Sequence, residues 1–487
     1  MARNPKAVPE SEPTASESKT RSQPEPVKPG PNERFTDPVV MTRQYAIGEV
    51  IGTGAFAEVK KVLHRATGDS RALKIVHKAG LQEQQLGQNQ LLQELKILQS
   101  LDHPSILHLY EWYEDKMKYY LITELCSGGE LFRLVSTHNQ LTEADVANVM
   151  YQVLSAVTYS HTKQVIHRDL KPENIFLIGE PGDLRVKVAD FGSSAVLDKN
   201  RRLSGVFGSG YYIAPEVIKG TYDEKCDVWS CGIILYILLT GVPPYPGNTE
   251  EAIMRSVERG DINLRKMQAL SSDAIQLILM MLKPDPKERV SASTAFEHCW
   301  IQRFREQSLI PPKLLTSALA NLKAFSRNCK LKDAILTFIA SQVITQAEER
   351  ELAQVFFTLD RNGDGRISRT ELLAKYGEVL GVTEAEREVT EIMQKIDLDQ
   401  SGFIDYKEFL KASMERSKHA SKDSLDAAFK MFDRDGDGRI SAEELRWVLT
   451  GGVVQDKAWE ELLREVDSNH DGEVDLREFM ALVQASF

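Results

Sequence analysis

The sequence predicts an α+β chain with a mixed domain, a helical connector and an all-helical domain. Residues 45–304 alternate apolar and polar side chains at first, as strands do, and later show helical periods. Residues 346–487 repeat an acidic motif between segments with helical apolar spacing, such as SLDAAFKMF. Residues 305–345 connect these two domains. Residues 1–40 are rich in Pro, Ser, Glu and Lys, which predicts a disordered tail.

The composition excludes several classes of protein. The five cysteines are scattered and form no CxxC pair, so we expect a reducing, cytoplasmic compartment and neither a disulfide framework nor a zinc site. The longest apolar run, CGIILYILLTGV at 231–242, is too short to span a bilayer and predicts a buried helix. The first residues hold no apolar secretory segment, and Ala2 stands where myristoylation needs glycine, so we expect no myristoylation of the start as written, and association with a membrane surface stays open.

The negative charge of the chain lies in its C-terminal part. The net charge of the whole chain is −11. Residues 346–487 hold 32 Asp and Glu against 19 Lys and Arg, a net of −13, which leaves +2 for residues 1–345. A nucleic-acid-binding protein usually shows a basic excess, so we expect no nucleic-acid partner.

Four copies of the acidic motif start 37, 36 and 34 residues apart. They are DRNGDGRISRTE (360–371), DLDQSGFIDYKE (397–408), DRDGDGRISAEE (433–444) and DSNHDGEVDLRE (467–478). Each has Asp at position 1, oxygen-bearing side chains at positions 3 and 5, Gly at position 6 and Glu at position 12. That is the ligand order of a calcium-binding loop. Acidic surface loops would explain one copy, but not four at a regular interval.

The predicted calcium ligands occupy positions 1, 3, 5, 7, 9 and 12, with the backbone carbonyl used at position 7. Position 8 is Ile or Val in every copy, which predicts a short strand that pairs two loops. The first loop has three acidic ligands against four in each other loop, so we expect it to be the weakest site. In chain order the predicted ligands are Asp360, Asn362, Asp364, Arg366, Ser368, Glu371, Asp397, Asp399, Ser401, Phe403, Asp405, Glu408, Asp433, Asp435, Asp437, Arg439, Ser441, Glu444, Asp467, Asn469, Asp471, Glu473, Asp475 and Glu478.

The mixed domain carries a series of motifs that are weak singly and specific together. A glycine loop, IGTGAFAEV at 51–59, could by itself mark only a hairpin. It is followed by Lys74 in RALKIV, Glu94 in LLQELKIL, VIHRDLKPENIF at 165–176, VKVADFGSS at 186–194 and YYIAPEV at 211–217. In this order and at these distances they resemble the signature set of eukaryotic protein kinases. The resemblance implies a bilobal protein-kinase fold for residues 45–304.

The resemblance also implies roles for single residues, since phosphoryl transfer needs charge neutralisation and alignment. Lys74 would hold the phosphates of ATP and would be oriented by an ion pair with Glu94. Asp190 and Asn174 would hold Mg²⁺, and Asp169 would accept the proton of the substrate hydroxyl. Lys171 indicates Ser or Thr as the acceptor. The nucleotide would also contact the glycine loop and the segment between the lobes, through Ile51, Gly52, Thr53, Gly54, Ala55, Val59, Thr123, Glu124 and Cys126.

Two further features concern substrates and regulation. Glu130 and Glu173 match positions that bind basic residues upstream of the target hydroxyl, although a solvated acidic face explains them equally well. Arg168 precedes Asp169, as in kinases that are switched by a phosphate on the activation loop, yet the acceptor position holds Gly205. A different switch is therefore expected, and the calcium loops are the candidate.

Kinase, connector and four calcium loops together resemble the calcium-dependent protein kinase family of plants and apicomplexan parasites. Residues 313–345 carry a net charge of +4 and place apolar side chains on one face, which predicts a basic amphipathic helix that a calmodulin-like module of four EF-hands would bind. The alternative is a helix packed permanently on the kinase. The predicted apolar faces are Leu315, Leu319, Leu322 and Phe325, then Leu331, Ile335, Phe338 and Ile339.

The sequence therefore predicts a monomeric, calcium-activated Ser/Thr kinase for basic protein substrates, with ATP, Mg²⁺ and Ca²⁺ as cofactors. The alternative is a calcium-responsive binding protein whose kinase fold is inactive. Ala57, in place of the third glycine of the glycine loop, is the one departure within the catalytic motifs. The sequence leaves open whether the connector merely blocks the kinase or whether the calcium-loaded module must also brace it.

Overall fold

The computed structural model describes residues 38–54, 57–83, 88–133, 141–179, 184–197, 202–205, 208, 210–245, 247, 249–305, 311–325, 330–380, 382–414, 422–450, 467 and 469–484. The described chain is of mixed α and β structure, which confirms the predicted α+β class. The predicted tail lies almost wholly outside the described residues, and so does Ala55.

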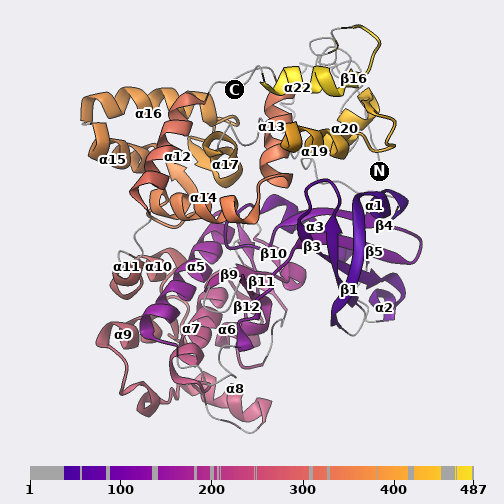
Figure 1. The fold of residues 1–487 in the computed structure, drawn as a ribbon. Coiled ribbons are helices and arrows are strands. Elements are labelled where there is room, and N and C mark those ends of the chain that lie inside the picture. Colours follow the sequence, from indigo (N-terminus) through magenta and orange to yellow (C-terminus); the bar gives the residue numbers. More distant parts are fainter. Residues whose placement is uncertain are drawn as a thin grey trace, which may run out of the picture.

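A small lobe is built on one antiparallel sheet with the strand order β1-β2-β3-β5-β4 (Figure 1). Apolar residues of this sheet, among them Leu73 and Ile122, are fully buried together with Tyr45. Helix α3 packs beside the sheet (Figure 1). The strands are β1 (Tyr45–Thr53), β2 (Ala57–His64), β3 (Ser70–His77), β4 (Leu109–Glu114) and β5 (Lys118–Glu124), and the helices are α1 (Pro38–Gln44), α2 (Lys78–Glu83) and α3 (Gln88–Ser100).

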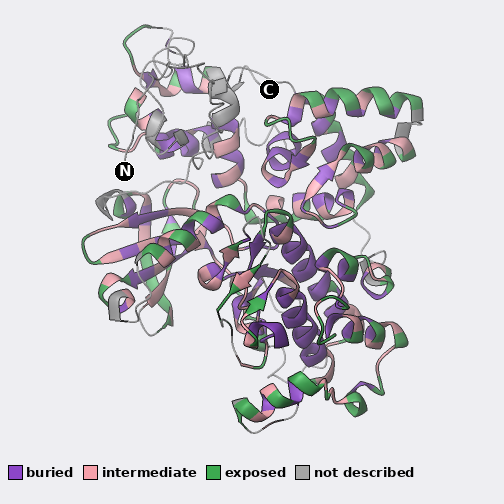
Figure 2. Cartoon of the chain, turned by 180° about the vertical axis from the view of Figure 1, so that it is seen from behind, coloured by how far each residue is buried: buried purple, intermediate pink, exposed green. Residues whose placement is uncertain are grey.

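A larger, mainly helical lobe follows, with two long helices at its centre. Helix α5 (Glu143–Thr162) begins at a capping box, in which Thr142 and Asp145 satisfy each other's backbone N–H groups. Helix α7 (Lys225–Thr240) contains the apolar run of the sequence and is buried on all sides, as predicted (Figure 2). No helix in the described part of the chain combines the length and apolarity that crossing a bilayer requires.

Shorter elements complete the larger lobe. The helices are α6 (Pro215–Ile218), α8 (Glu250–Arg259), α9 (Ser272–Met281), α10 (Ala292–Phe296) and α11 (Cys299–Arg305), with 3₁₀ turns η1 (Pro172–Asn174), η2 (Phe191–Ser193) and η3 (Leu264–Met267). The strands are β6 (Gly129–Glu130), β7 (Val165–Ile166), β8 (Ile175–Ile178), β9 (Arg185–Val188), β10 (Ala195–Val196), β11 (Leu203–Ser204) and β12 (Thr221–Tyr222).

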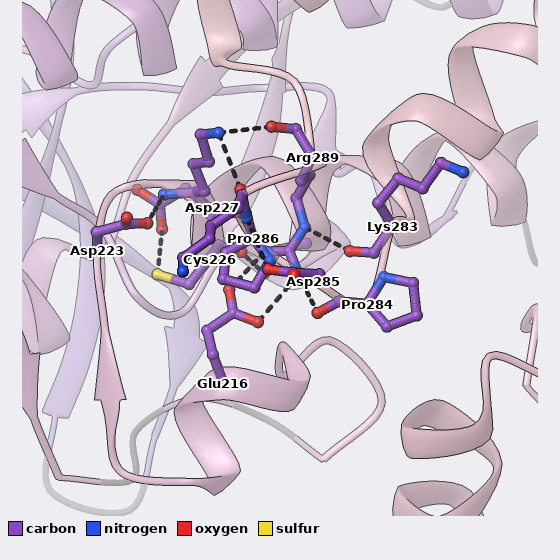
Figure 3. A network of polar contacts seen from close by, with 12 residues as sticks. Glu216, Asp223, Cys226, Asp227, Lys283, Pro284, Asp285, Pro286 and Arg289 are labelled. Atoms are coloured by element: carbon purple, nitrogen blue, oxygen red, sulfur yellow. Dashed lines mark hydrogen bonds and ion pairs between the residues drawn. The ribbon is translucent and has the colours of Figure 1, made fainter.

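A buried ion pair anchors the segment between residues 190 and 217 to this lobe. The guanidinium of Arg289, which is 1% exposed, donates to both carboxylate oxygens of Glu216 in the Ala-Pro-Glu motif (Figure 3). Lys225 donates to the carbonyls of Pro286 and Arg289 beside it. Removing one partner of a buried pair typically costs about 3–5 kcal/mol, so this network fixes where that segment ends.

The described residues of the C-terminal module, which spans residues 346–484, hold four loops that pair two by two. Ile367 pairs with Ile404, and Ile440 pairs with Val474, so the position-8 residues form the two short strand pairs that the sequence predicted. All four of these side chains are buried. The elements are α14 (Gln346–Leu359), β13 (Arg366–Ser368), α15 (Arg369–Leu380), α16 (Val382–Ile396), β14 (Phe403–Asp405), α17 (Tyr406–Ser413), α19 (Lys422–Phe432), β15 (Arg439–Ile440), α20 (Ala442–Thr450), β16 (Val474–Asp475) and α22 (Leu476–Gln484).

The connector forms two helices, α12 (Pro312–Ala324) and α13 (Lys330–Gln342), where the sequence suggested one amphipathic helix. Helix α12 packs against α14, α16 and α17 of the first pair of loops, whereas α13 lies between α17 and the helices α20 and α22 of the second pair (Figure 1). Leu319, Leu322 and Phe325 join the apolar core of the first pair of loops, while Ile335 and Ile339 join the core of the second pair. Two separate cores need two separately oriented helices, which is the physical reason for the break. The side chain of Leu331 lies outside the described residues.

Candidate functional site

Asp227 of α7 fixes the backbone of the His-Arg-Asp segment, residues 167–169, through hydrogen bonds. Both carboxylate oxygens of Asp227 accept backbone hydrogen bonds of 2.9 Å, one from His167 and one from Arg168. Arg168 has φ +68°, a left-handed conformation that is uncommon outside glycine and needs such support. The turn directs Asp169 toward Lys171 and Asn174.

Three predicted catalytic residues lie together at this turn. The ammonium of Lys171 is 2.7 Å from Oδ2 of Asp169. The amide of Asn174 donates to the backbone carbonyl of Asp169 at 2.9 Å and to Oδ2 at 3.3 Å. These contacts fix the carboxylate of Asp169 as an acceptor at the mouth of the site, with a cation and an amide beside it.

Asp190, Glu94 and Lys74 form a second charged group across the lobes. Asp190 has φ +62°, and Phe191 behind it is buried against the ring of His167, with 4.7 Å between the ring centroids. Burial raises the pKa of Glu94, the charge of Lys74 lowers it, and the charge of Asp190 raises it again. The predicted ion pair between Lys74 and Glu94 is not formed in the described part of the chain, although the charge of Lys74 acts on the carboxyl group of Glu94.

The predicted nucleotide-binding residues lie on neighbouring strands of the small lobe. Gly52 of β1 pairs with Val59 of β2, and Val59 pairs with Lys74 of β3. Thr123 and Glu124 end β5, and Cys126 follows them. Ile51 is exposed on the edge strand β1, and Thr53 and Gly54 follow it, whereas Lys74 lies on β3 at the centre of the sheet.

The acidic residues expected to bind substrate lie on two segments that contact each other next to the catalytic turn. Glu130 is exposed on β6, which lies against η1, and Glu173 is part of η1. Oε2 of Glu173 is buried and has no hydrogen-bond partner among the described residues. An unpaired buried carboxylate oxygen is costly unless a partner arrives, which makes this oxygen a candidate acceptor for a basic group.

Arg168, whose counterparts bind an activation-loop phosphate, has protein partners here. Its guanidinium donates to the carbonyls of Ser193 and Ser194 and, at 3.3 Å, to the hydroxyl of Tyr222. Gly205 has φ +94°, which a residue with a side chain rarely adopts.

The four predicted calcium loops share one arrangement of hydrogen bonds. In each loop the position-6 glycine donates its N–H to the position-1 aspartate, at 2.8 or 2.9 Å. The position-12 glutamate accepts from backbone N–H groups early in the loop. The side chains therefore converge on the loop interior, where carboxylate oxygens of Asp397, Asp399 and Glu408 lie within 4.8 Å of one another. Asp433, Asp435 and Glu444 do the same.

The electrostatics of these loops fit a hard divalent cation. Burial and the charges of Asp364 and Glu371 raise the pKa of Asp360 to about 8. Burial and the charge of Asp405 raise the pKa of Glu408 to about 7. Carboxylates that repel one another to this extent lack a counter-charge, and six to eight oxygens on a short loop are what calcium takes.

The end of the connector and the start of the module contact the kinase lobes through two buried cations that sequence reasoning missed. Arg71 of β3 is 1% exposed and donates to the side-chain oxygen and the backbone carbonyl of Gln342, both at 3.0 Å. Lys187 of β9 is 2.9 Å from Glu124 and 3.7 Å from Glu349 of α14. The sequence did hold a signal for these contacts, because each cation stands within an otherwise apolar strand. Arg71 is the Arg of RALKIV, and Lys187 is the Lys of VKVAD.

The pKa values show that the second contact is a charged cluster. Burial alone would lower the pKa of Lys187, but the carboxylates of Glu124 and Glu349 raise it above its ordinary value. Burial raises the pKa of Glu124 to about 7, against the lowering effect of Lys187. The side chain of Glu124 is held by Lys187 and by the backbone N–H of His108, and its predicted contact with the nucleotide stays a prediction.

Comparisons with known proteins agree with this architecture. A model of the protein kinase domain matches residues 45–301, and a model of the EF-hand domain pair matches residues 349–414 and 422–484. The chain is 40% identical over 456 residues to Calcium-dependent protein kinase 4 of Plasmodium berghei (strain Anka), an alignment that covers 91% of this chain and 86% of that protein. The chain belongs to the calcium-dependent protein kinase family.

Other members of the family are similarly close. Calcium-dependent protein kinase 4 of Plasmodium falciparum (isolate 3D7) is also 40% identical over 456 residues, again 91% of this chain and 86% of that protein. Calcium-dependent protein kinase 9 of Arabidopsis thaliana is 36% identical over 448 residues, which is 91% of this chain and 81% of that protein. As a calcium-dependent protein kinase the chain is a calcium-regulated Ser/Thr kinase, and nothing supports the alternative of an inactive kinase fold.

The first prediction tests the catalytic turn of this calcium-dependent protein kinase. Asp169→Asn and Lys74→Met should each lower phosphate transfer to a Ser/Thr peptide by roughly 10²–10⁴-fold or more, because each removes a charge at the reacting groups. Calcium binding, followed by titration calorimetry, should be unchanged because the loops are distant from both residues. Substantial transfer by either variant would refute these two roles.

The second prediction tests the back of the nucleotide site. Thr123 is half-buried on β5, between its strand neighbours Ala72 and Leu109. Thr123→Gly should open space there and lower the inhibitory concentration of an ATP-site ligand with a bulky aromatic group at that position. Leu109, the other neighbour of Thr123, is the same in the variant and in the unmodified protein. Equal inhibition of both proteins would show that Thr123 does not line this pocket.

Proposed function

We propose that this kinase phosphorylates Ser or Thr next to basic residues and that its calcium-loaded module braces the two lobes. The observation that carries the proposal is the seating of both connector helices within the module, together with its attachment to β3 and β9. Each attached strand leads to a predicted nucleotide-site residue: Arg71 precedes Lys74 by three positions, and Lys187 precedes Asp190 by three positions. A module fastened at these two points can set the distance between the lobes.

The residues of the catalytic turn have separate tasks in this proposal. Asp169 accepts the proton of the substrate hydroxyl, and Lys171 stabilises the negative charge that develops beside it. Lys74 orients the phosphates of ATP once Glu94 approaches it. Asp190 and Asn174 are the residues that would hold Mg²⁺, which supplies charge neutralisation at the phosphates. The buried pair of Arg289 and Glu216 keeps the activation segment open for the substrate.

The switch follows from the charges and the apolar cores. The connector is basic and the module is acidic, so the two attract one another. In the structure the rings of Phe338 and Phe432 lie 4.7 Å apart, and Phe356, Phe429, Met431 and Phe479 line the two cores that take up the connector helices. Calcium, when bound, neutralises the loop carboxylates and favours open helix pairs. The connector helices are then held by the module, and Gln342 at the end of α13 attaches the connector to Arg71 of the small lobe.

We further propose a cytoplasmic monomer. The described cysteines, Cys126, Cys226, Cys231 and Cys299, are all free, which suits a reducing compartment. The grooves of the module are filled by α12 and α13 of the same chain, so no second copy is needed to occupy them.

The third prediction concerns the substrate. Peptides with Arg upstream of the acceptor should be preferred, because Glu130 and the unpartnered oxygen of Glu173 can pair with the guanidinium. Glu130→Lys should reduce the preference over an Ala-substituted peptide by a factor of about five, the equivalent of about 1 kcal/mol for an exposed pair. Glu258→Lys, an exposed reversal on α8, is the control for net charge. An unchanged preference in Glu130→Lys would place the acidic surface elsewhere.

The fourth prediction separates bracing from simple blocking. Glu349→Gln and Gln342→Leu each remove the module's half of one contact while Lys187 keeps Glu124 and Arg71 keeps Tyr45. In saturating calcium, both should lower kcat/KM for ATP by roughly five- to thirtyfold, as a loss of 1–2 kcal/mol would.

The matched control for this experiment is Glu351→Gln, which removes an exposed charge from the same helix as Glu349. It should leave kcat/KM for ATP unchanged. All three variants should still reach saturation with calcium, because none of these residues is a loop ligand, and kcat/KM is compared at saturation. Full activity of Glu349→Gln and Gln342→Leu would leave blocking by the connector as the whole mechanism.

A further inference from the structure

The first calcium loop lies directly against aromatic rings of the large lobe. A Cβ atom placed on Gly363 would come within 2.5 Å of the ring of Phe296, and one placed on Gly365 would come within 2.8 Å of Cγ of Tyr159. The glycine backbone thus touches the two rings, with no room for a side chain on either residue. Asp360, at the start of this loop, is 0% exposed.

Three rings of the large lobe receive the loop and the helix before it, and they are here termed the aromatic platform: Tyr159, Phe296 and Tyr151. Tyr151 and Phe296 have ring centroids 4.9 Å apart. The hydroxyl of Tyr151 donates to the carbonyl of Phe357 at 3.2 Å, and their rings pack edge to face at 5.6 Å. Phe357 lies on α14, three residues before the loop, so helix and loop dock together.

The equivalent glycines of the other loops have open surroundings. Gly436 occupies position 4 of the third loop, as Gly363 does in the first, and a Cβ there would meet nothing within 4 Å. The same holds at position 6 for Gly402, Gly438 and Gly472. Contact between loop glycines and kinase rings is therefore a property of the first loop within the described structure.

We infer that the first calcium loop is itself the docking element for the aromatic platform, so that calcium binding at this loop and docking on the kinase are one linked equilibrium. The inference deepens the proposed function and rests on it, because it names the loop through which calcium reaches the kinase. Asp360 accepts the N–H groups of Gly363 and Gly365 at 2.8 and 2.9 Å, which gives the glycine backbone the shape that the platform receives. The ligands that bind calcium thus also shape the docking surface.

Linkage has a definite consequence for affinity. The factor by which calcium at the first loop strengthens docking equals the factor by which docking strengthens calcium binding there, typically about 5- to 150-fold. Alone, the first loop has the fewest acidic ligands of the four and should bind weakly. Docked on the platform, it should bind more tightly, whereas the open third loop gains nothing from the kinase.

The test is a calcium titration of the intact chain, without ATP or substrate, followed by NMR. The position-6 glycine N–H of every loop donates to the position-1 carboxylate, so the amide signals of Gly365 and Gly438 report the first and third loops separately. The matched variants are Gly363→Ala and Gly436→Ala. Both place Ala at position 4 with positive φ, +68° and +79°, so both add similar backbone strain, but only the first meets the platform.

We expect Gly363→Ala to lose more calcium affinity in the first loop than Gly436→Ala loses in the third loop. Gly363→Ala should shift the calcium midpoint of Gly365 upward by at least about fivefold more than Gly436→Ala shifts the midpoint of Gly438. Small-angle scattering in calcium should show a larger radius of gyration only for Gly363→Ala, because only that module undocks. Equal losses in the two loops would overturn the inference.

A second variant covers the case in which Gly363→Ala does not fold. Tyr151→Phe removes the hydroxyl that holds Phe357 without touching the loop, and it should raise the calcium midpoint of Gly365 while leaving Gly438 unchanged. An unchanged midpoint of Gly365 would then overturn the inference. Because the readout is calcium occupancy, a failure here is distinct from a failure of the proposed function, which would appear as equal kinase activity with chelator and with calcium.

Discussion

The arrangement of the whole chain depends on one buried ammonium group, that of Lys187. A charge that is 4% exposed cannot remain without partners, and Lys187 has two: Glu124 between the lobes and Glu349 on the first helix of the module. Without the module, Lys187 would keep Glu124 as its one carboxylate partner in this cluster, and both side chains would become exposed to solvent. Asp190 follows β9, three residues after Lys187, so the pairing of this cation and the geometry of the nucleotide site are coupled through β9.

Arg71 repeats this logic in the small lobe. Its guanidinium donates to Gln342 and to Tyr45, and it lies 3.7 Å from the centroid of the Tyr110 ring. The two cations attach the end of the connector and the start of the module to one strand from each lobe. Calcium need not reach the catalytic turn to affect it. It needs only to favour the form of the module in which these two attachments and the first-loop contact exist together.

Local features of the chain were predictable because each depends on nearby residues. The pairing of Ile367 with Ile404 follows from their place in the loop repeat, and the burial of Leu322 and Ile339 follows from helical spacing. The break between α12 and α13 was not predictable, because both halves carry the same basic, apolar pattern and only the two separate cores distinguish them. The pairing of Lys187 with Glu349 joins residues far apart in sequence, and periodicity holds no information on such pairs. The first loop was expected to be the weakest from its ligands alone, and its contact with the platform adds an energy that the loop sequence does not contain.

The most direct test of the bracing account is hydrogen exchange of β3 and β9 in the intact chain, compared in calcium and in chelator. The account predicts that the amides around Arg71 and Lys187 exchange more slowly in calcium, because the buried attachments must open before these strands can exchange. Exchange in α7, which has no contact with the module, should be the same in both conditions. Equal protection of β3 and β9 with and without calcium, in a chain whose activity still requires calcium, would contradict the account.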